Sequence, residues 1–481
     1  MTRRPDPSAR AEADCFAAAD RMVVQRAPIR STRRRTPAIR RLWLTWIAFV
    51  VYGSLVPLDF MPLPLSTAWA SFAQSPWLQL GVASRADWVA NGVLYLPVGF
   101  LGAASLLTTR PRGASGSASA GSALALAFAI GVALAVAVEF TQVFFPPRTV
   151  SLNDLFAEAI GTLLGALAAR FGTERLRRLI AGFATGGAPF LRKLAPAYAF
   201  GYLALALFPY DVLVSADEWA QKLRGANVGW WLAESGRGVT WSVTVAKLLL
   251  EVVAVMPIGA WWMARPTPTG EVIAHRTLPW MPALALGGLL GLVIEIVQLC
   301  IGSGVSQGVS VLTRSLGFAI GVAIFASRTT FSDYAMRNVL RRATLPLLAL
   351  YLLALTALHG WWRGAWVGIE QAWQRLAELH YLPFYYHYFT TEMQAVTSLL
   401  AAACSYAPVA VFCWAWYLSP GVAALTAAML ALVVEVGRLT SADGHPDPTN
   451  LLIAATSAWA FLRLIDAVNA NDRPPRQGVT A

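Results

Sequence analysis

Two stretches of the chain, ADWVANGVLYLPVG (Ala86–Gly99) and EFTQVFFPPRTVSLNDLFAEAIGTLLG (Glu139–Gly165), place acidic and amide side chains inside apolar sequence. Such groups are costly in a membrane and usually face the interior of a helix bundle or a polar cavity. They define a set of candidate site residues: Asp87, Asn91, Glu139, Gln142, Asp154 and Glu158. The two stretches also decide the fold, because related patterns return later in the chain.

The second occurrence keeps the spacing of the first. VAKLLLEVVAVMPIG (Val245–Gly259) matches the first stretch, and the segment Glu295–Gly321 matches the second without a gap. A third, fainter occurrence keeps a reduced polar set: Glu435, Arg438 and Asn450. Because internal repeats determine architecture, the pattern predicts three similar helical units. We expect them at residues 42–180, 190–328 and 340–468, with tails at 1–41 and 469–481.

Composition indicates an all-α integral membrane protein. Hydrophobic residues make up 57% of the chain and charged residues 13%, and the mean hydropathy is +0.53. Charged residues are about half as frequent as in soluble domains. About twelve segments are long enough to span a membrane. They run over 42–57, 87–106, 122–145, 152–170, 196–213, 241–264, 279–301, 309–326, 343–359, 392–417, 419–438 and 449–466.

The distribution of basic residues predicts the topology. Eleven arginines precede the first expected span, and further basic clusters follow the fourth and eighth spans, on the same side. The positive-inside rule therefore places both termini in the cytoplasm, in a bacterial-type cytoplasmic (inner) membrane. The basic tail at 1–41 is then a topology signal, and we expect no nucleic acid as a partner. Membrane lipid is the expected partner.

Metal and redox chemistry find no support in the sequence. The four cysteines form no C-x-x-C pair, and the five histidines show no H-x-x-x-H or H-E-x-x-H spacing. No G-x-x-x-x-G-K-[ST] motif is present, which argues against an ATP-driven pump. We expect neither a metal nor a cofactor.

Helical spacing groups the polar residues on shared faces. Asp87 and Asn91 are four residues apart, and Glu139 and Gln142 are three apart, so each pair lies on one helix face. Asp154 lies at the start of a helix that Ser151 or Asn153 would cap. Pro146, Pro147 and Arg148 interrupt the chain between these helices, so the connector is expected to line an outer-facing polar cavity.

These residues resemble the VanZ-like membrane family over about 42–170. The resemblance rests on an acidic, Asn-bearing helix ending in Pro and Gly, an E-x-x-Q helix, an arginine and an Asp-led helix with spaced glycines. In this chain the matching residues are Asp87, Asn91, Pro97, Gly99, Glu139, Gln142, Arg148, Asp154, Gly161 and Gly165. The family's named member is associated with resistance to the glycopeptide antibiotic teicoplanin. The resemblance supplies no established reaction or catalytic residue.

The later copies replace acidic residues with basic or neutral ones. Asp87 and Asn91 become Lys247 and Glu251, and Glu158 becomes Arg314. We expect structural ion pairs in the second unit, either between Lys247 and Glu251 or between Glu295 and Arg314. The complete polar set of the first unit is the better candidate for ligand binding or proton handling.

Two classes of function remain open. The first is a non-enzymatic protein that binds a lipid-linked cell-envelope component or a glycopeptide-type amphiphile through the first unit. The second is a membrane enzyme or proton-coupled transporter that uses Glu139 and Asp154 as acid and base or as a proton relay. The outer loop of the first unit contains no histidine that could act as a nucleophile, which argues against a lipid-phosphatase mechanism.

Overall fold

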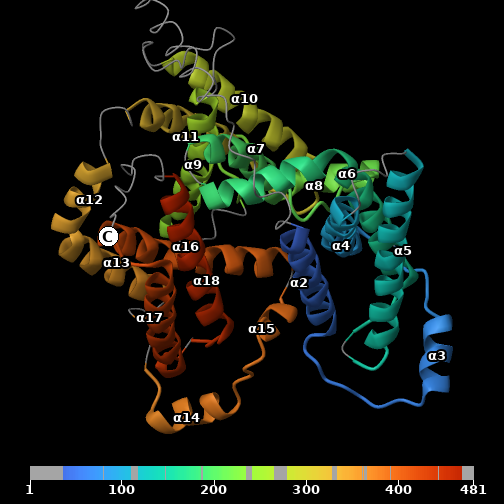
Figure 1. Ribbon diagram of the computed structural model, residues 1–481. Helices are drawn as coiled ribbons and strands as arrows, with labels where there is room; N and C mark the ends of the chain where they lie inside the picture. The colour runs from blue at the N-terminus through green and yellow to red at the C-terminus, as the bar shows by residue number, and fades with distance from the viewer. Residues whose placement is uncertain are drawn as a thin grey trace, which may run out of the picture.

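The computed structural model describes residues 36–79, 81–109, 117–146, 148–185, 188–234, 241–264, 279–327, 333–359, 361, 366–390, 392–442 and 444–468. Most of the expected tail at 1–41 and all of that at 469–481 lie outside these residues. Helices form nearly all of the regular structure within them (Figure 1). We call residues 42–180, 190–328 and 340–468 the first, second and third segments.

The described N-terminal part contains the following helices. They are α2 (Thr36–Leu55), α3 (Leu65–Ala73), α4 (Val82–Thr109), α5 (Ser117–Gln142), α6 (Leu152–Thr185) and α7 (Ala188–Ala206). Helix α2 begins before the expected first span and includes Arg40 and Arg41. Helix α6 is longer than its expected span, because it continues through a charged stretch after Arg170. Pro97 lies inside α4.

The second and third segments continue the helical pattern. Their remaining elements are α8 (Ala216–Arg224), β1 (Val228–Gly229), α9 (Trp241–Met263), α10 (Trp280–Leu299), β2 (Ser306–Gln307), α11 (Gly308–Ser327), α12 (Asp333–Arg342), α13 (Thr344–Leu358), α14 (Ile369–Ala377), α15 (Tyr385–Tyr388), α16 (Glu392–Ala415), α17 (Pro420–Thr440) and α18 (Thr449–Val468). Strands β1 and β2 pair in parallel over two residues each. Pro257 in α9 and Pro408 in α16 correspond to Pro97 in α4.

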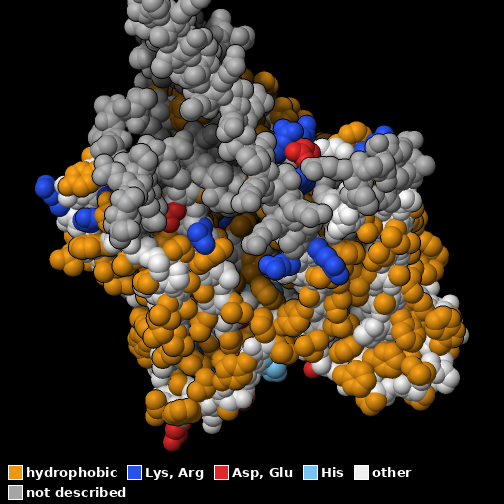
Figure 2. Space-filling model, viewed as in Figure 1, with side chains coloured by type: hydrophobic (Ala, Val, Ile, Leu, Met, Phe, Trp, Pro, Cys, Tyr) orange, Lys and Arg blue, Asp and Glu red, His pale blue; other side chains and the backbone are white. Residues whose placement is uncertain are grey.

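Within the described residues, eight helices are long and apolar enough to cross a membrane: α4, α5, α6, α10, α11, α16, α17 and α18. A ninth span results if α12 and α13, which meet at 67°, act together. Many large apolar side chains on these helices are exposed, such as Leu126, Leu289 and Leu425. Figure 2 shows hydrophobic side chains over most of the described surface of the lower half of the molecule, as a lipid-contacting protein requires. The other three expected spans, 42–57, 196–213 and 241–264, stay predictions.

Glycines allow helices to cross closely in the first two segments. A Cβ atom at Gly161 or Gly165 of α6 would overlap a backbone oxygen of α4. At Gly317 and Gly321 of α11 it would overlap a backbone oxygen of α9 in the same way. Small residues are the usual means of close helix approach in membranes. These crossings bring the polar ends of α4 and α6, and of α9 and α11, next to each other.

Polar contacts join the segments to one another. Arg85 of α4 forms a two-pronged ion pair with Glu218 of α8, with both N to O distances 3.1 Å. The Tyr52 hydroxyl of α2 donates to the Pro383 carbonyl at 2.6 Å. The Arg148 guanidinium lies over the ring of Tyr388 in α15, 4.3 Å from its centroid. The first segment therefore contacts both of the others near the connector between α5 and α6.

Candidate functional site

The first site lies where the end of α5 meets the start of α6 and the neighbouring part of α4. Glu139 is in the last turn of α5, and Asp154 is in the first turn of α6. The Asn91 side chain of α4 donates to Asp154 Oδ1 at 2.8 Å. The Ser151 hydroxyl donates to Asp154 Oδ2 at 2.6 Å and accepts from the Asp154 amide at 3.2 Å. Ser151 is therefore the residue that caps α6.

Two further carboxylates lie beside Asp154. Glu139 and Glu158 are each only 3% exposed, and each interacts electrostatically with the other and with Asp154. Glu139 Oε2 and Glu158 Oε2 are buried without a hydrogen-bond partner. Within the described part of the chain, none of the three carboxylates forms an ion pair. Buried carboxylates in this state are costly unless a proton or a cation compensates them.

Gln142 and Arg148 are held by the end of α2. The Gln142 side chain donates to the Ser54 carbonyl at 3.0 Å. Arg148 donates through Nε to the Val56 carbonyl at 2.8 Å and through Nη2 to the Gly53 carbonyl at 2.7 Å. Burial lowers the pKa of Arg148, while Tyr388 and Glu139 act in the opposite direction. Arg148 thus anchors the connector and lies near Glu139 without pairing with it.

Asp87 differs from the other candidates. It is exposed on α4, one turn before Asn91, whereas Glu139 and Glu158 are buried. The structure therefore brings together Asn91, Glu139, Asp154 and Glu158, and leaves Asp87 at the surface near them.

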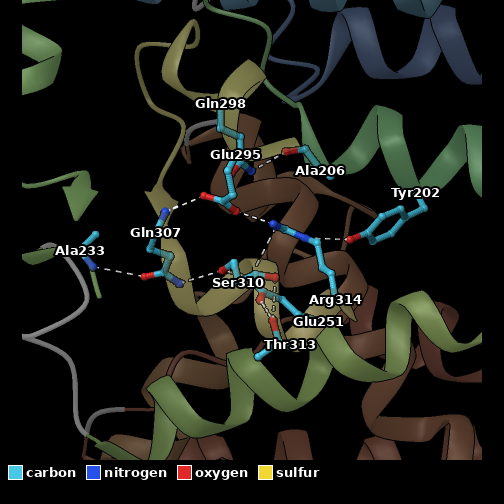
Figure 3. Close-up of polar contacts among 10 residues, drawn as sticks. All are labelled: Tyr202, Ala206, Ala233, Glu251, Glu295, Gln298, Gln307, Ser310, Thr313 and Arg314. Carbon is cyan, nitrogen blue, oxygen red and sulfur yellow. Dashed lines mark hydrogen bonds and ion pairs between the residues drawn. The ribbon is translucent and has the colours of Figure 1, made fainter. Parts of the chain in front are cut away.

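The second site has the same framework with a different charge balance (Figure 3). Arg314 of α11, at the position of Glu158, forms an ion pair with Glu295 and lies 3.7 Å from a carboxylate oxygen of Glu251. Glu251 also accepts from Ser310 at 2.9 Å and from Thr313 at 2.5 Å. One guanidinium of the chain thus lies within ion-pair distance of both carboxylates of the second site.

Of the two pairings expected as alternatives in the second segment, the one between Lys247 and Glu251 is not found among the described residues. Lys247 is exposed on α9 and forms no ion pair among the described residues, whereas Glu251 faces α11. The alternative pairing, between Glu295 and Arg314, is present. Helical spacing placed Lys247 and Glu251 on neighbouring turns, but the hydroxyls and guanidinium of α11 determine where Glu251 points.

The third site also contains its own cation. Arg438 Nη1 lies 3.3 Å from Glu435 Oε1, and the Asn450 side chain donates to the same oxygen at 2.8 Å. Arg438 occupies the position of Gln142 in the repeat pattern. The arginine that pairs with the glutamate therefore stands at a different repeat position in the third site than in the second.

One backbone contact recurs in all three sites. Each glutamate at the end of its helix accepts the amide N–H of the residue twelve positions later. The pairs are Glu139 with Ser151, Glu295 with Gln307 at 2.6 Å, and Glu435 with Asp447 at 2.7 Å.

A glutamine contact recurs in the first two sites. The Gln298 side chain donates to the Ala206 carbonyl at 2.8 Å, and the Gln142 side chain donates to the Ser54 carbonyl.

Sequence reasoning missed two hydroxyl residues in the first site. Tyr95 is fully buried and interacts electrostatically with Glu158 and Glu139. Thr162 is also fully buried, one turn after Glu158. Tyr95 is four residues after Asn91 and Thr162 four after Glu158, so helical spacing could have found both. Among the described residues, no group of three His, Cys, Asp or Glu side chains is placed to hold a metal ion.

Comparison with known proteins supports the family resemblance. Residues 28–173 match the VanZ/LLP1 family model, so the chain is VanZ-like over this part, which contains the whole first site. No curated protein and no solved structure matches the chain.

Proposed function

We propose that this protein is a multi-pass membrane protein that binds a cell-envelope amphiphile, a lipid or a glycopeptide-type molecule, at the first site. Glu139, Asp154 and Glu158 would contact the ligand. Gln142 and Arg148 would hold the connector, and Asn91 would orient Asp154. Asp87 would lie at the exposed edge of the site.

One observation carries the proposal. Three coupled carboxylates in the first site lack an ion-paired cation in the described chain, whereas Glu295 and Glu435 in the other sites each pair with an arginine. A buried charged group without a partner is unusual in a site that serves only stability. The matching glutamates of the other two sites are thus paired with an arginine of the chain. The first site therefore has carboxyl groups available to pair with a cationic ligand.

We further propose that the three segments are VanZ-like units of four spans each, with both termini in the cytoplasm of a bacterial-type cytoplasmic membrane. The recurring glutamate-to-amide contact supports the repeats. The clustering of basic residues in alternate loops supports the orientation. In this arrangement the connector between α5 and α6 faces the outside, so an envelope ligand would reach the first site from there.

A second candidate function is proton-coupled transport. The burial of Glu139 and Glu158 beside Asp154 favours it, because intramembrane carboxylates also serve as proton relays. A relay predicts that neutralising one carboxylate stops proton movement in vesicles even when no amphiphile is bound.

Lipid analysis of the purified protein tests the proposed function. The protein is extracted in mild detergent, and its bound lipids are identified by mass spectrometry. We expect one lipid class to be enriched with the wild type and lost with Asp154→Asn. Asn450→Ala, at the matching position of the third site, serves as the control and should retain it. Equal lipid profiles for the wild type and Asp154→Asn would contradict the proposal.

A further inference from the structure

The three sites differ most clearly in the source of positive charge. Each recurring glutamate accepts a backbone N–H in the same way, so the three carboxylates occupy comparable settings. Arg314 supplies a guanidinium to Glu295, and Arg438 supplies one to Glu435. A guanidinium matches a carboxylate because it presents several N–H donors in a fixed plane.

The first site holds neither of these arginines. Glu158 stands at the position of Arg314, and Gln142 stands at that of Arg438. Gln142 donates to the Ser54 carbonyl instead. The nearby Arg148 donates to the carbonyls of Val56 and Gly53 and stacks on an aromatic ring. Among the described residues, no guanidinium is therefore paired with Glu139.

Two buried carboxylate oxygens of the first site lack a hydrogen-bond donor. Glu139 Oε2 and Glu158 Oε2 have no hydrogen-bond partner, and both side chains are 97% buried, since each is 3% exposed. The fully buried hydroxyl of Tyr95 acts on Glu158 as a hydrogen-bond donor, and neither this hydroxyl nor the rest of the described site supplies a cation. Both carboxylate oxygens can accept a hydrogen bond, and the two side chains interact with each other, so a cation with several N–H donors would satisfy them together.

We infer that the first site binds an organic cation with N–H donors, a protonated amine or guanidinium group, in place of the arginine that the other two sites carry. This inference rests on the proposed function, because the cation would be the headgroup of the bound amphiphile. The ligand would enter from the exposed side of Asp154 and pair with Glu139 and Glu158.

Matched amphiphiles test the inference directly. The full chain is purified in a maltoside detergent, and its melting temperature is measured with decylguanidinium or with decanol, which has the same alkyl chain and no charge. Only a ligand that prefers the folded protein raises the melting temperature. We expect decylguanidinium to raise it and decanol to leave it unchanged. Equal effects of the two probes would overturn the inference.

A charge exchange within the site supplies the decisive variant. Glu158→Arg copies the second site, so its guanidinium should pair with Glu139 and remove the effect of decylguanidinium. Glu174→Arg makes the same charge change on an exposed part of α6 and should retain the effect. If Glu158→Arg does not fold, Glu158→Gln should still weaken the effect. A full response in a folded Glu158 variant would overturn the inference.

The two proposals can fail separately. Enrichment of an uncharged or anionic lipid that depends on Asp154, without a decylguanidinium response, would leave the proposed function standing and overturn the cation site. A decylguanidinium response that Glu158→Arg abolishes, without any enriched lipid, would support the cation site and contradict the proposed amphiphile.

Discussion

Arg314 of α11 forms a buried ion pair with Glu295 of α10, and the first segment carries an acid, Glu158, at the position of that arginine. The two segments otherwise share the glutamate-to-amide contact and the close glycine crossing. The exchange of this one residue therefore places a carboxyl group where the second site has its guanidinium.

Removal of the buried guanidinium should destabilise the second segment. Arg314→Met leaves Glu295 and Glu251 without their cation, and breaking a buried pair in this way costs about 3 to 5 kcal/mol. The double variant Arg314→Met/Glu295→Gln should recover part of the loss. Thermal melting in detergent measures both effects.

Lys247 provides the comparison for this prediction. Its side chain is exposed and unpaired within the described residues, so Lys247→Met should change stability by less than about 0.5 kcal/mol. A large loss in Lys247→Met together with a small loss in Arg314→Met would contradict the assignment of charges in the second site.

A leucine at Gly161 should disrupt the crossing of α4 and α6. Its Cβ atom would overlap the Gly92 carbonyl oxygen, which belongs to the backbone and cannot rotate away. We expect a loss of at least about 1 to 3 kcal/mol, as for other overpacked positions. Gly121→Ala on α5 meets no atom within 4 Å and should have little effect. Similar melting temperatures for the two variants would contradict the close crossing.

Helical periodicity predicted much of the first site and of its helices. The expected span 152–170 lies inside α6, and Asn91 of α4 contacts Asp154 of α6. Apolar runs could not predict that α6 continues to Thr185, because its later turns are charged and amphipathic.

Helical periodicity could not predict contacts between residues that lie far apart in the sequence. Periodicity reports which face a residue occupies and not which helix will lie against that face. It therefore gave no indication that Arg148 would stack on Tyr388, which lies in another segment. It also placed Lys247 beside Glu251, although hydroxyl groups of α11 orient that carboxylate.

The proposed topology predicts which residues a membrane-impermeant thiol reagent can reach. In a variant without the four natural cysteines, Thr149→Cys, in the exposed part of the connector, should react from outside the cell. Arg178→Cys, near the other end of α6, should react only after the membrane is permeabilised. The opposite pattern would invert the orientation, and labelling of both from outside would exclude a spanning α6.

The contact between the first two segments should weaken in acid. Hydrogen bonds from Arg85 and from the amides of Val214 and Ser215 lower the pKa of Glu218 from 4.5 to about 2. A carboxylate with a lowered pKa in the folded state contributes stability above its unfolded pKa and loses that contribution as the pH falls toward the folded value. The contribution of Glu218 should therefore be complete above about pH 5 and decline between about pH 4.5 and about pH 2.

Glu218→Gln isolates this contribution, because the other titrating groups of the chain are the same in both proteins. We expect the wild type to melt at a higher temperature than Glu218→Gln near neutral pH, and the difference to shrink as the pH falls through about 4. The salt bridge is partly exposed, with side chains 19% and 22% accessible for Arg85 and Glu218, so added salt should reduce the difference as well. A difference that stays constant from neutral pH to about pH 3 would mean that the Glu218 charge does not stabilise the contact, which would then rest on other interactions such as the hydrogen bond from Arg85 to the Val212 carbonyl.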